Sequence, residues 1–311
     1  MQIDIAGICI SSRNLDEYQI VKNLINELSP NTEIFDFADV LKDISILEKC
    51  DFILTIGGDG SVAWLVGTFF ETFNTVKSLK PIIPVVRPQS IGYLKQIDLE
   101  EEKFKIGFTD LLKGEYHIRN RTILKTTIVG HPYVAVNEIF LMSSPHLGQF
   151  TVYIQHNDDG FLPITTTMAD GAMISTGLGS TGWGLSYRGQ ISLTENSIGL
   201  TFAGGIHTSA NFTLPRKLVK MKFNLKNTII NKNTLIIYEK QREVLGLPKD
   251  DDPNSTLELV YGSRVLVDGR IVGFGIEEVE IDSSESIPFV FLNRESVVDK
   301  ARKLTRQPDV K

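Results

Sequence analysis

The stretch DFILTIGGDGSVAWLV, residues 51–66, decides the fold class because it joins a strand pattern to a helix pattern through Gly57-Gly58-Asp59-Gly60. In an open α/β sheet, ligands bind where strands turn into helices. Glycines allow a phosphate to approach the backbone, and an aspartate there can accept a hydroxyl proton or hold a cation through water. The residues alone leave a second interpretation open, a tight turn in which Asp59 caps the helix.

Around this stretch, the first third of the chain alternates between strand and helix patterns, with Asn14 as the expected N-cap of the first helix. Such alternation predicts a parallel sheet with helices on its faces. The predicted strands are 3–10, 32–37, 51–56 and 81–86, and the predicted helices are 14–28, 38–50, 61–77 and 98–113.

The pattern changes near Gly114, after which short β-like runs follow one another to about residue 285. Asp268-Gly269 lies between two apolar runs and predicts a two-residue hairpin turn. We therefore expect a Rossmann-like α/β domain over 1–113, an all-β domain of antiparallel sandwich type over 114–285, and a C-terminal segment, 286–311, that packs back on the first domain. A helical pattern covers 295–306 within that segment.

Composition excludes several classes of protein. The 311 residues are 42% hydrophobic and 23% charged, with a formal net charge of -6, so a general nucleic-acid binder is not expected. Two cysteines without paired spacing fit a reducing compartment. No apolar run approaches the roughly 18 residues of a membrane helix, and the first ten residues lack a basic export signal. We expect a cytoplasmic protein with no membrane partner.

A second glycine-rich stretch, residues 169–189, mixes glycines with hydroxyl side chains after Asp170. It lacks the Lys-Ser/Thr pair of a P-loop, yet hydroxyls and backbone N–H groups leading into a short helix suit phosphate. Trp183 and Tyr187 offer rings for stacking. The alternative is an irregular loop of the β domain with core aromatics.

Asn137 and Glu138 interrupt the apolar run YVAVNEIFLM, residues 133–142. Burying an amide and a carboxylate costs several kcal/mol unless both are paired. Either one of the two faces solvent, or the pair is buried beside a ligand such as a sugar diol.

Taken in order, these motifs resemble the NAD kinase family. That family carries a GGDG element after a strand, an Asn-Glu pair in an apolar strand, and an Asp-Gly segment that leads into a Thr-Pro-Thr-Gly-Ser-Thr-Ala-Tyr loop. The resemblance extends over roughly residues 50–285. It includes Gly92-Tyr93-Leu94, which is similar to part of a Leu-Gly-Phe-Leu segment, and 267–270, which is similar to an Asp-Gly-Gln hairpin.

The resemblance implies an enzyme that uses ATP or polyphosphate to phosphorylate the adenosine ribose 2′-hydroxyl of NAD, giving NADP. It implies that Asp59 is the base and the indirect organiser of Mg²⁺. Phosphate would be held by the N–H groups of Gly57, Gly58 and Gly60 and by Arg87, with Arg188 a further candidate. NAD would be bound by Tyr93, Asn137, Glu138, Asp170, Ser175, Thr176, Ser180, Thr181, Gly182, Trp183 and Ser186. A homodimer or homotetramer is also implied.

The chain departs from the family pattern in several places. Gly177-Leu178 replaces Pro-Thr, Gly182-Trp183 replaces Ala-Tyr, Arg87 stands where the family has Asn, and no Pro-His element follows the loop. Two alternatives therefore stay open, a related kinase of a lipid or other alcohol and a non-catalytic dinucleotide-binding protein of the same fold. The choice between NAD and NADH as acceptor also stays open.

Overall fold

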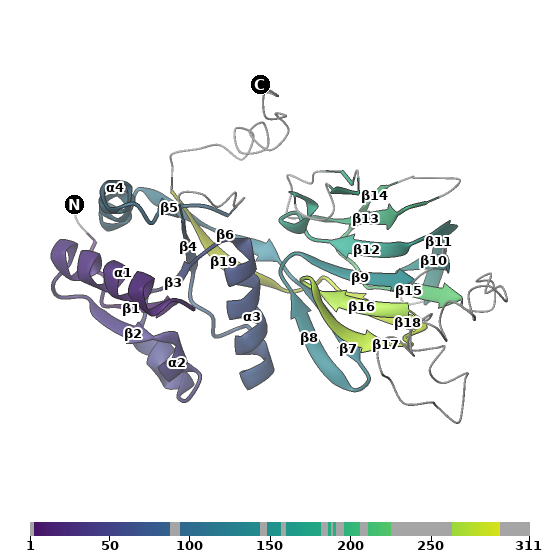
Figure 1. Ribbon diagram of the computed structural model, residues 1–311, viewed down its shortest axis with the longest axis horizontal. Helices are drawn as coiled ribbons and strands as arrows, with labels where there is room; N and C mark the ends of the chain where they lie inside the picture. The colour runs from purple at the N-terminus through teal and green to yellow at the C-terminus, as the bar shows by residue number, and fades with distance from the viewer. Residues whose placement is uncertain are drawn as a thin grey trace, which may run out of the picture.

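The computed structural model describes residues 3–87, 94–143, 148–156, 160–181, 186–187, 189–190, 196–205, 211–224 and 263–292 (Figure 1). Tyr93, Gly182, Trp183 and Arg188 lie outside these residues, as does the helical pattern at 295–306. Among the helices of the described segments, none combines the length and the apolar character of a membrane span.

The N-terminal part is built on a seven-stranded sheet in the order β2-β1-β3-β4-β19-β6, with β5 paired to β4. The first four strands are parallel, and β6 runs antiparallel to β19, which itself is parallel to β4. The strands are β1 (Gly7–Ser11), β2 (Glu33–Asp36), β3 (Phe52–Ile56), β4 (Ile82–Val86), β5 (Ile97–Asp98), β6 (Tyr116–Thr122) and β19 (Ser286–Leu292). The chain thus returns to its first sheet after the β-rich segments.

Helices cover both faces of this sheet, which confirms the predicted α/β architecture. One face packs against α1 (Leu15–Leu28) and α4 (Glu101–Leu112), and the other against α2 (Phe37–Val40) and α3 (Asp59–Phe73). The predicted cap is confirmed, because Asn14 Oδ1 accepts the Asp16 N–H at 2.9 Å.

The predicted helix 38–50 is wrong. The structure has α2 and then a separate 3₁₀ helix, Ile44–Lys49. The Asp43 carboxylate accepts the Ser45 N–H at 3.0 Å, and such a side-chain bond starts a new helix instead of continuing the old one.

The C-terminal part is a sandwich of two six-stranded antiparallel sheets, as predicted. One sheet has the order β11-β10-β15-β18-β7-β8 and the other β14-β13-β12-β9-β16-β17, and a single apolar core lies between them. The strands are β7 (Leu124–Ile128), β8 (His131–Ala135), β9 (Glu138–Ser143), β10 (Gly148–Gln155), β11 (Phe161–Ala169), β12 (Gly171–Ser175), β13 (Ser197–Ala203), β14 (Phe212–Pro215), β15 (Val219–Asn224), β16 (Ser263–Val267), β17 (Arg270–Phe274) and β18 (Glu278–Asp282).

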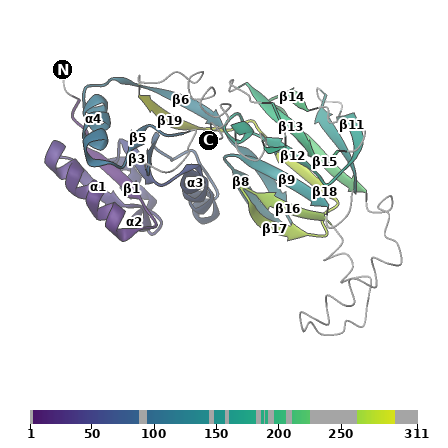
Figure 2. The ribbon, with the colours of Figure 1, turned by 45° about the horizontal axis from the view of Figure 1, so that its top comes forward.

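Helix α3 joins the two parts. It lies between the first sheet and β8 in both views (Figures 1 and 2). Val134, Val136 and Leu178 of the β-rich part belong to the same buried cluster as Val66 and Phe69 of α3. The apolar core therefore continues from one part into the other.

Candidate functional site

The Gly57-Gly58-Asp59-Gly60 turn connects β3 to α3 at the carboxyl edge of the parallel sheet. Gly57 has φ 137° and donates its N–H to the Val85 carbonyl at 2.8 Å. A Cβ at Gly57 would overlap the Ser61 hydroxyl, so both its backbone conformation and its surroundings require glycine. The turn is fixed by the fold and exposes the amino end of a 15-residue helix.

Asp59 is the first residue of α3 and is not its cap. The cap position is Gly58, where no side-chain hydrogen bond closes the helix. The half-buried Asp59 instead accepts the backbone N–H of Leu94 through Oδ1 at 3.2 Å. The capping interpretation of the sequence is therefore wrong, and the carboxylate bridges two loops at the edge of the sheet.

Glu138 begins β9 and Asn137 directly precedes it, beside the glycine–hydroxyl stretch. Glu138 is 6% exposed and pairs across the strands with Ser175 at the end of β12. The Asn137 carbonyl accepts the Thr176 N–H at 2.8 Å, and the Thr176 hydroxyl donates to the Val136 carbonyl at 2.6 Å. Distant motifs of the sequence thus meet at one place.

The turn after Thr176 is packed tightly on the Asn137 backbone. Ser180 donates its N–H to the Thr176 carbonyl at 3.0 Å and its hydroxyl to the Gly177 carbonyl at 2.7 Å. A Cβ on Gly179 would overlap the Asn137 carbonyl, so only glycine fits there. Ser175, Thr176 and Ser180 are all about 1% exposed.

Asp268 is a residue of this site that the sequence did not single out. The predicted Asp268-Gly269 hairpin turn is confirmed, with φ of 47° and 77° at its two residues. The Asp268 carboxylate accepts the N–H groups of Val136 at 2.8 Å, Asn137 at 2.8 Å and Glu138 at 3.1 Å. The only signal in the sequence was the hairpin itself, which gave no indication of these distant partners.

The two neighbouring carboxyl groups hold protons more tightly than usual. Burial, followed by the negative charge of Asp268, raises the pKa of Glu138 to about 8. Burial raises the pKa of Asp268 to about 6, although the three N–H groups and Arg270 favour its charged form. At neutral pH Glu138 is therefore mainly a neutral acid, able to donate one hydrogen bond and to accept others.

Some predicted site residues lie apart from this cluster. Asp170 is exposed at the opposite end of β12 from Ser175, a separation of about 16 Å at the usual rise of a strand. Ser186 is exposed, and the ring of its neighbour Tyr187 contacts Phe140 with centroids 5.8 Å apart. Thr181, by contrast, directly follows Ser180 and ends the 3₁₀ turn Gly179–Thr181 of the cluster itself.

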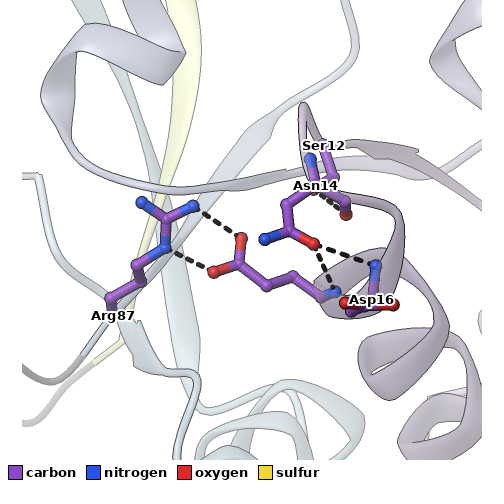
Figure 3. Close-up of polar contacts among 5 residues, drawn as sticks. Ser12, Asn14, Asp16 and Arg87 are labelled. Carbon is purple, nitrogen blue, oxygen red and sulfur yellow. Dashed lines mark hydrogen bonds and ion pairs between the residues drawn. The ribbon is translucent and has the colours of Figure 1, made fainter.

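Arg87 follows β4 at the same sheet edge as the glycine turn, but it is already paired. Its guanidinium makes a two-point ion pair with Glu17, with Nη2 2.9 Å from Oε2 and Nε bonded to Oε1 (Figure 3). Glu17 lies in the first turn of α1, next to the Asn14 cap. A role in phosphate binding would require Arg87 to exchange this partner.

The described residues hold no group of three or more His, Cys, Asp and Glu side chains arranged for a metal ion. Asp59 alone still fits Mg²⁺, because this ion is usually held by one or two carboxylates together with substrate phosphates.

No model of a protein family matches the chain. Curated NAD kinases are similar to it, including those of Fusobacterium nucleatum at 31% identity over 183 residues, Buchnera aphidicola at 31% over 186, and Pyrococcus abyssi at 32% over 152. These alignments cover 58%, 58% and 48% of this chain. They span only 61%, 56% and 50% of the relatives' own lengths.

Two solved structures are similar over almost the whole chain. An NAD kinase from Archaeoglobus fulgidus in complex with ATP has a TM-score of 0.65 at 17% identity, and covers 95% of this chain and 98% of its own. A yeast NADH kinase complexed with NADH has a TM-score of 0.68 at 20% identity. That alignment covers 100% of this chain and 91% of the yeast chain. At these identities the structures show the fold, which is that of NAD and NADH kinases. The chain is therefore similar to NAD kinases both in part of its sequence and in its fold.

Proposed function

We propose that this protein is an NAD kinase that transfers the terminal phosphate of ATP to the 2′-hydroxyl of the adenosine ribose of NAD. One observation carries the proposal: Asn137-Glu138 contacts both the Thr176–Ser180 turn and Asp268. The glycine turn that precedes α3 lies on the neighbouring sheet edge. Curated relatives named NAD kinase, at about 30% identity, support the same reaction.

Recognition of the acceptor falls to Asn137 and Glu138. A neutral Glu138 offers one donor and one acceptor, and the Asn137 amide offers both as well. Two adjacent hydroxyls of a ribose need that combination. The remaining dinucleotide contacts are assigned to Ser175, Thr176, Ser180, Thr181 and Ser186, to Gly182 and Trp183, to Tyr93, and to Asp170.

Asp59 is the proposed base. Its carboxylate takes the proton of the 2′-hydroxyl while the oxygen forms a bond to the γ-phosphorus, and the bond from that phosphorus to the β–γ bridging oxygen breaks to release ADP. Phosphoryl transfer depends mostly on positioning and charge neutralisation. The fixed glycine turn serves positioning, because Gly58 and Gly60 let phosphates approach the backbone closely. The Gly57 N–H is already bonded to the Val85 carbonyl, so Gly57 shapes the turn and does not itself bind phosphate.

Mg²⁺, held by Asp59 and the donor's phosphates, would neutralise the charge that develops on the phosphate oxygens. Inorganic polyphosphate is the alternative donor, and NADH the alternative acceptor. We further propose a cytoplasmic homodimer or homotetramer, from the family resemblance. Sedimentation of the purified protein at several concentrations tests this assembly, and a monomer throughout would contradict it.

The test of the reaction is a coupled assay. The protein is incubated with NAD, ATP and Mg²⁺, and NADP is measured with an NADP-specific dehydrogenase. Parallel reactions contain NADH as acceptor or polyphosphate as donor. If folded protein binds NAD by calorimetry but forms no NADP with either donor, the proposal fails and a binding role replaces it. Phosphorylation of a lipid alcohol without NADP formation would favour the related kinase instead.

A further inference from the structure

Two short links carry the chain between the α/β part and the sandwich. The chain passes to the sandwich at Ile123, between β6 and β7, and returns at residues 283–285, between β18 and β19. Strands β6 and β19 are paired neighbours in the first sheet and lead toward the sandwich side by side (Figures 1 and 2). The orientation of one part relative to the other therefore depends on these links.

The two links are bonded to each other and lie beside helix α3. Ile123 is fully buried and donates its N–H to the Glu285 carbonyl at 3.2 Å. The Lys125 ammonium is 3.0 Å from the Glu285 carboxylate and 5.5 Å from the centroid of the Phe70 ring of α3. The links and α3 thus form one junction between the two parts.

Arg216, between β14 and β15, holds the second link from the side of the sandwich. Its Nε donates to the Ser283 carbonyl at 2.8 Å, and its Nη2 donates to the carbonyls of Ser284 at 2.7 Å and Glu285 at 3.0 Å. The hydroxyl of the fully buried Ser283 donates to the Lys217 carbonyl at 3.0 Å. Because residues 283–285 lie between strands, Arg216 supplies the donors that a strand ladder would supply elsewhere.

These hydrogen bonds fix a direction that apolar packing does not. Burial of the apolar residues around α3 stabilises the junction but is non-directional. Hydrogen bonds weaken steeply when they are bent. A guanidinium points its N–H groups in fixed directions from one plane, which the ammonium of a lysine cannot do. The contact of Arg216 with three consecutive carbonyls therefore defines the angle at which the second link leaves the sandwich.

We infer that Arg216 is a positioning residue for the proposed phosphoryl transfer, because it sets the orientation of the sandwich on the α/β part. The inference rests on the proposed function. Asp59 belongs to the α/β part and Asn137-Glu138 to the sandwich, so the acceptor hydroxyl meets the base only when the two parts are correctly oriented. A displacement of about 1 Å far from the reacting atoms can lower a rate by roughly 100-fold.

The test compares wild type with Arg216→Gln and with the milder Arg216→Lys, which keeps the charge but loses the planar fork. Thr32→Val is the matched control. The buried Thr32 hydroxyl donates to the Ile5 carbonyl at 3.0 Å, beside β2, at the opposite edge of the first sheet from β6. Its loss should lower the Tm without turning one part relative to the other.

Three quantities are measured on the full chain. The coupled assay gives kcat, and calorimetry gives the Kd for NAD. Double electron–electron resonance gives the distance distribution between spin labels at Glu102→Cys in α4 and Lys222→Cys in β15, two exposed positions on different parts. The native Cys9 and Cys50 are buried, so they should not take up the label.

We expect Arg216→Gln to lower kcat by roughly ten- to a hundredfold and to broaden the distance distribution, while the Kd for NAD stays at its wild-type value. Arg216→Lys should fall between this variant and wild type in both. The Thr32→Val control should keep the wild-type kcat and distribution despite its lower Tm, which separates positioning from a general loss of stability.

A wild-type kcat, an unchanged distance distribution or a loss of NAD binding in Arg216→Gln would overturn the assignment. The same outcomes decide it for Arg216→Lys if the glutamine variant does not fold. If wild-type protein makes no NADP but Arg216→Gln still broadens the distribution, the proposed reaction fails and the role of Arg216 in orienting the two parts remains.

Discussion

Single residues carry the chemistry proposed for this protein, and Asp59 is the first of them. Its position at the start of α3, with Oδ1 3.2 Å from the Leu94 nitrogen, ties its carboxylate to a loop across the sheet edge. A residue that served only to cap the helix would bond to an N–H group of α3 itself. Its geometry therefore suits a role outside the helix.

Replacing Asp59 with Asn should lower kcat for NADP formation by roughly 10²–10⁴-fold, the usual contribution of a positioned base. The amide keeps the size of the side chain and still accepts the Leu94 N–H, so the fold should be retained. Undiminished turnover in the coupled assay would reject Asp59 as the base while leaving the proposed reaction intact.

Glu138 gives a prediction about pH. The pKa of its buried carboxyl is raised from 4.5 to about 8, so between these values the folded state binds a proton that the unfolded state releases. Stability should therefore fall as pH rises through this window, with a slope of at most about 1.4 kcal/mol per pH unit. Asp268, whose pKa is raised to about 6, contributes less to this slope as the pH rises above 6, and comparison with a Glu138 variant separates the two carboxyl groups.

Glu138→Gln should flatten this dependence. Urea unfolding of both proteins at pH 6.5, 7.25 and 8 measures it directly. Equal slopes for variant and wild type would show that Glu138 has an ordinary pKa in the folded state.

At the scale of elements, the β16–β17 hairpin supports the start of β9. The turn residue Asp268 holds three consecutive N–H groups, which fixes the backbone that presents Asn137 and Glu138. The partners lie at least 130 positions away along the chain. A hairpin signal in the sequence can predict such a turn but not the strand it supports.

Asp268→Asn preserves the turn, because Asn-Gly suits this hairpin as well as Asp-Gly does. It replaces a carboxylate acceptor with an amide, and we expect a loss of about 1–3 kcal/mol in the free energy of unfolding. The KM for NAD should rise more than the KM for ATP. Asp4→Asn, at an exposed position near the N-terminus, is the control. It should match wild type in the free energy of unfolding and in the KM for NAD. A stability loss without a change in the KM for NAD would make the role of Asp268 purely structural.

Periodicity predicted the alternating α/β part and the antiparallel sandwich, because burial on one face or both leaves a local pattern. Contacts between residues that lie far apart in the chain leave no such local pattern in the sequence. The Arg87–Glu17 ion pair joins residues 70 positions apart, so a side chain assigned to phosphate from its place in a motif proved to have a partner already.

At the scale of the whole molecule, the core that runs from α3 into the β-rich part makes the two parts one structural unit. Leu178 stands where the NAD kinase pattern has a threonine, and here it is 4% exposed within that shared core. This departure therefore has a packing role. It strengthens the contact of the glycine–hydroxyl turn with the α/β part.

Leu178→Ala should lower the free energy of unfolding by about 2–5 kcal/mol, the usual cost of such a truncation in a core. Denaturant unfolding followed by circular dichroism and by fluorescence should give one coincident transition for wild type. Two separate wild-type transitions would contradict the continuity of the core, and an unchanged midpoint in the variant would contradict the packing of Leu178.

The most direct measurement of the central claim is NADP formation by the purified chain from NAD, ATP and Mg²⁺, compared with its Asp59→Asn variant. The geometry of the glycine turn and of the Asn137-Glu138 cluster predicts NADP production by wild type and a loss of roughly 10²-fold or more in the variant. Folded, NAD-binding wild-type protein that yields no NADP with ATP or polyphosphate would contradict the assignment.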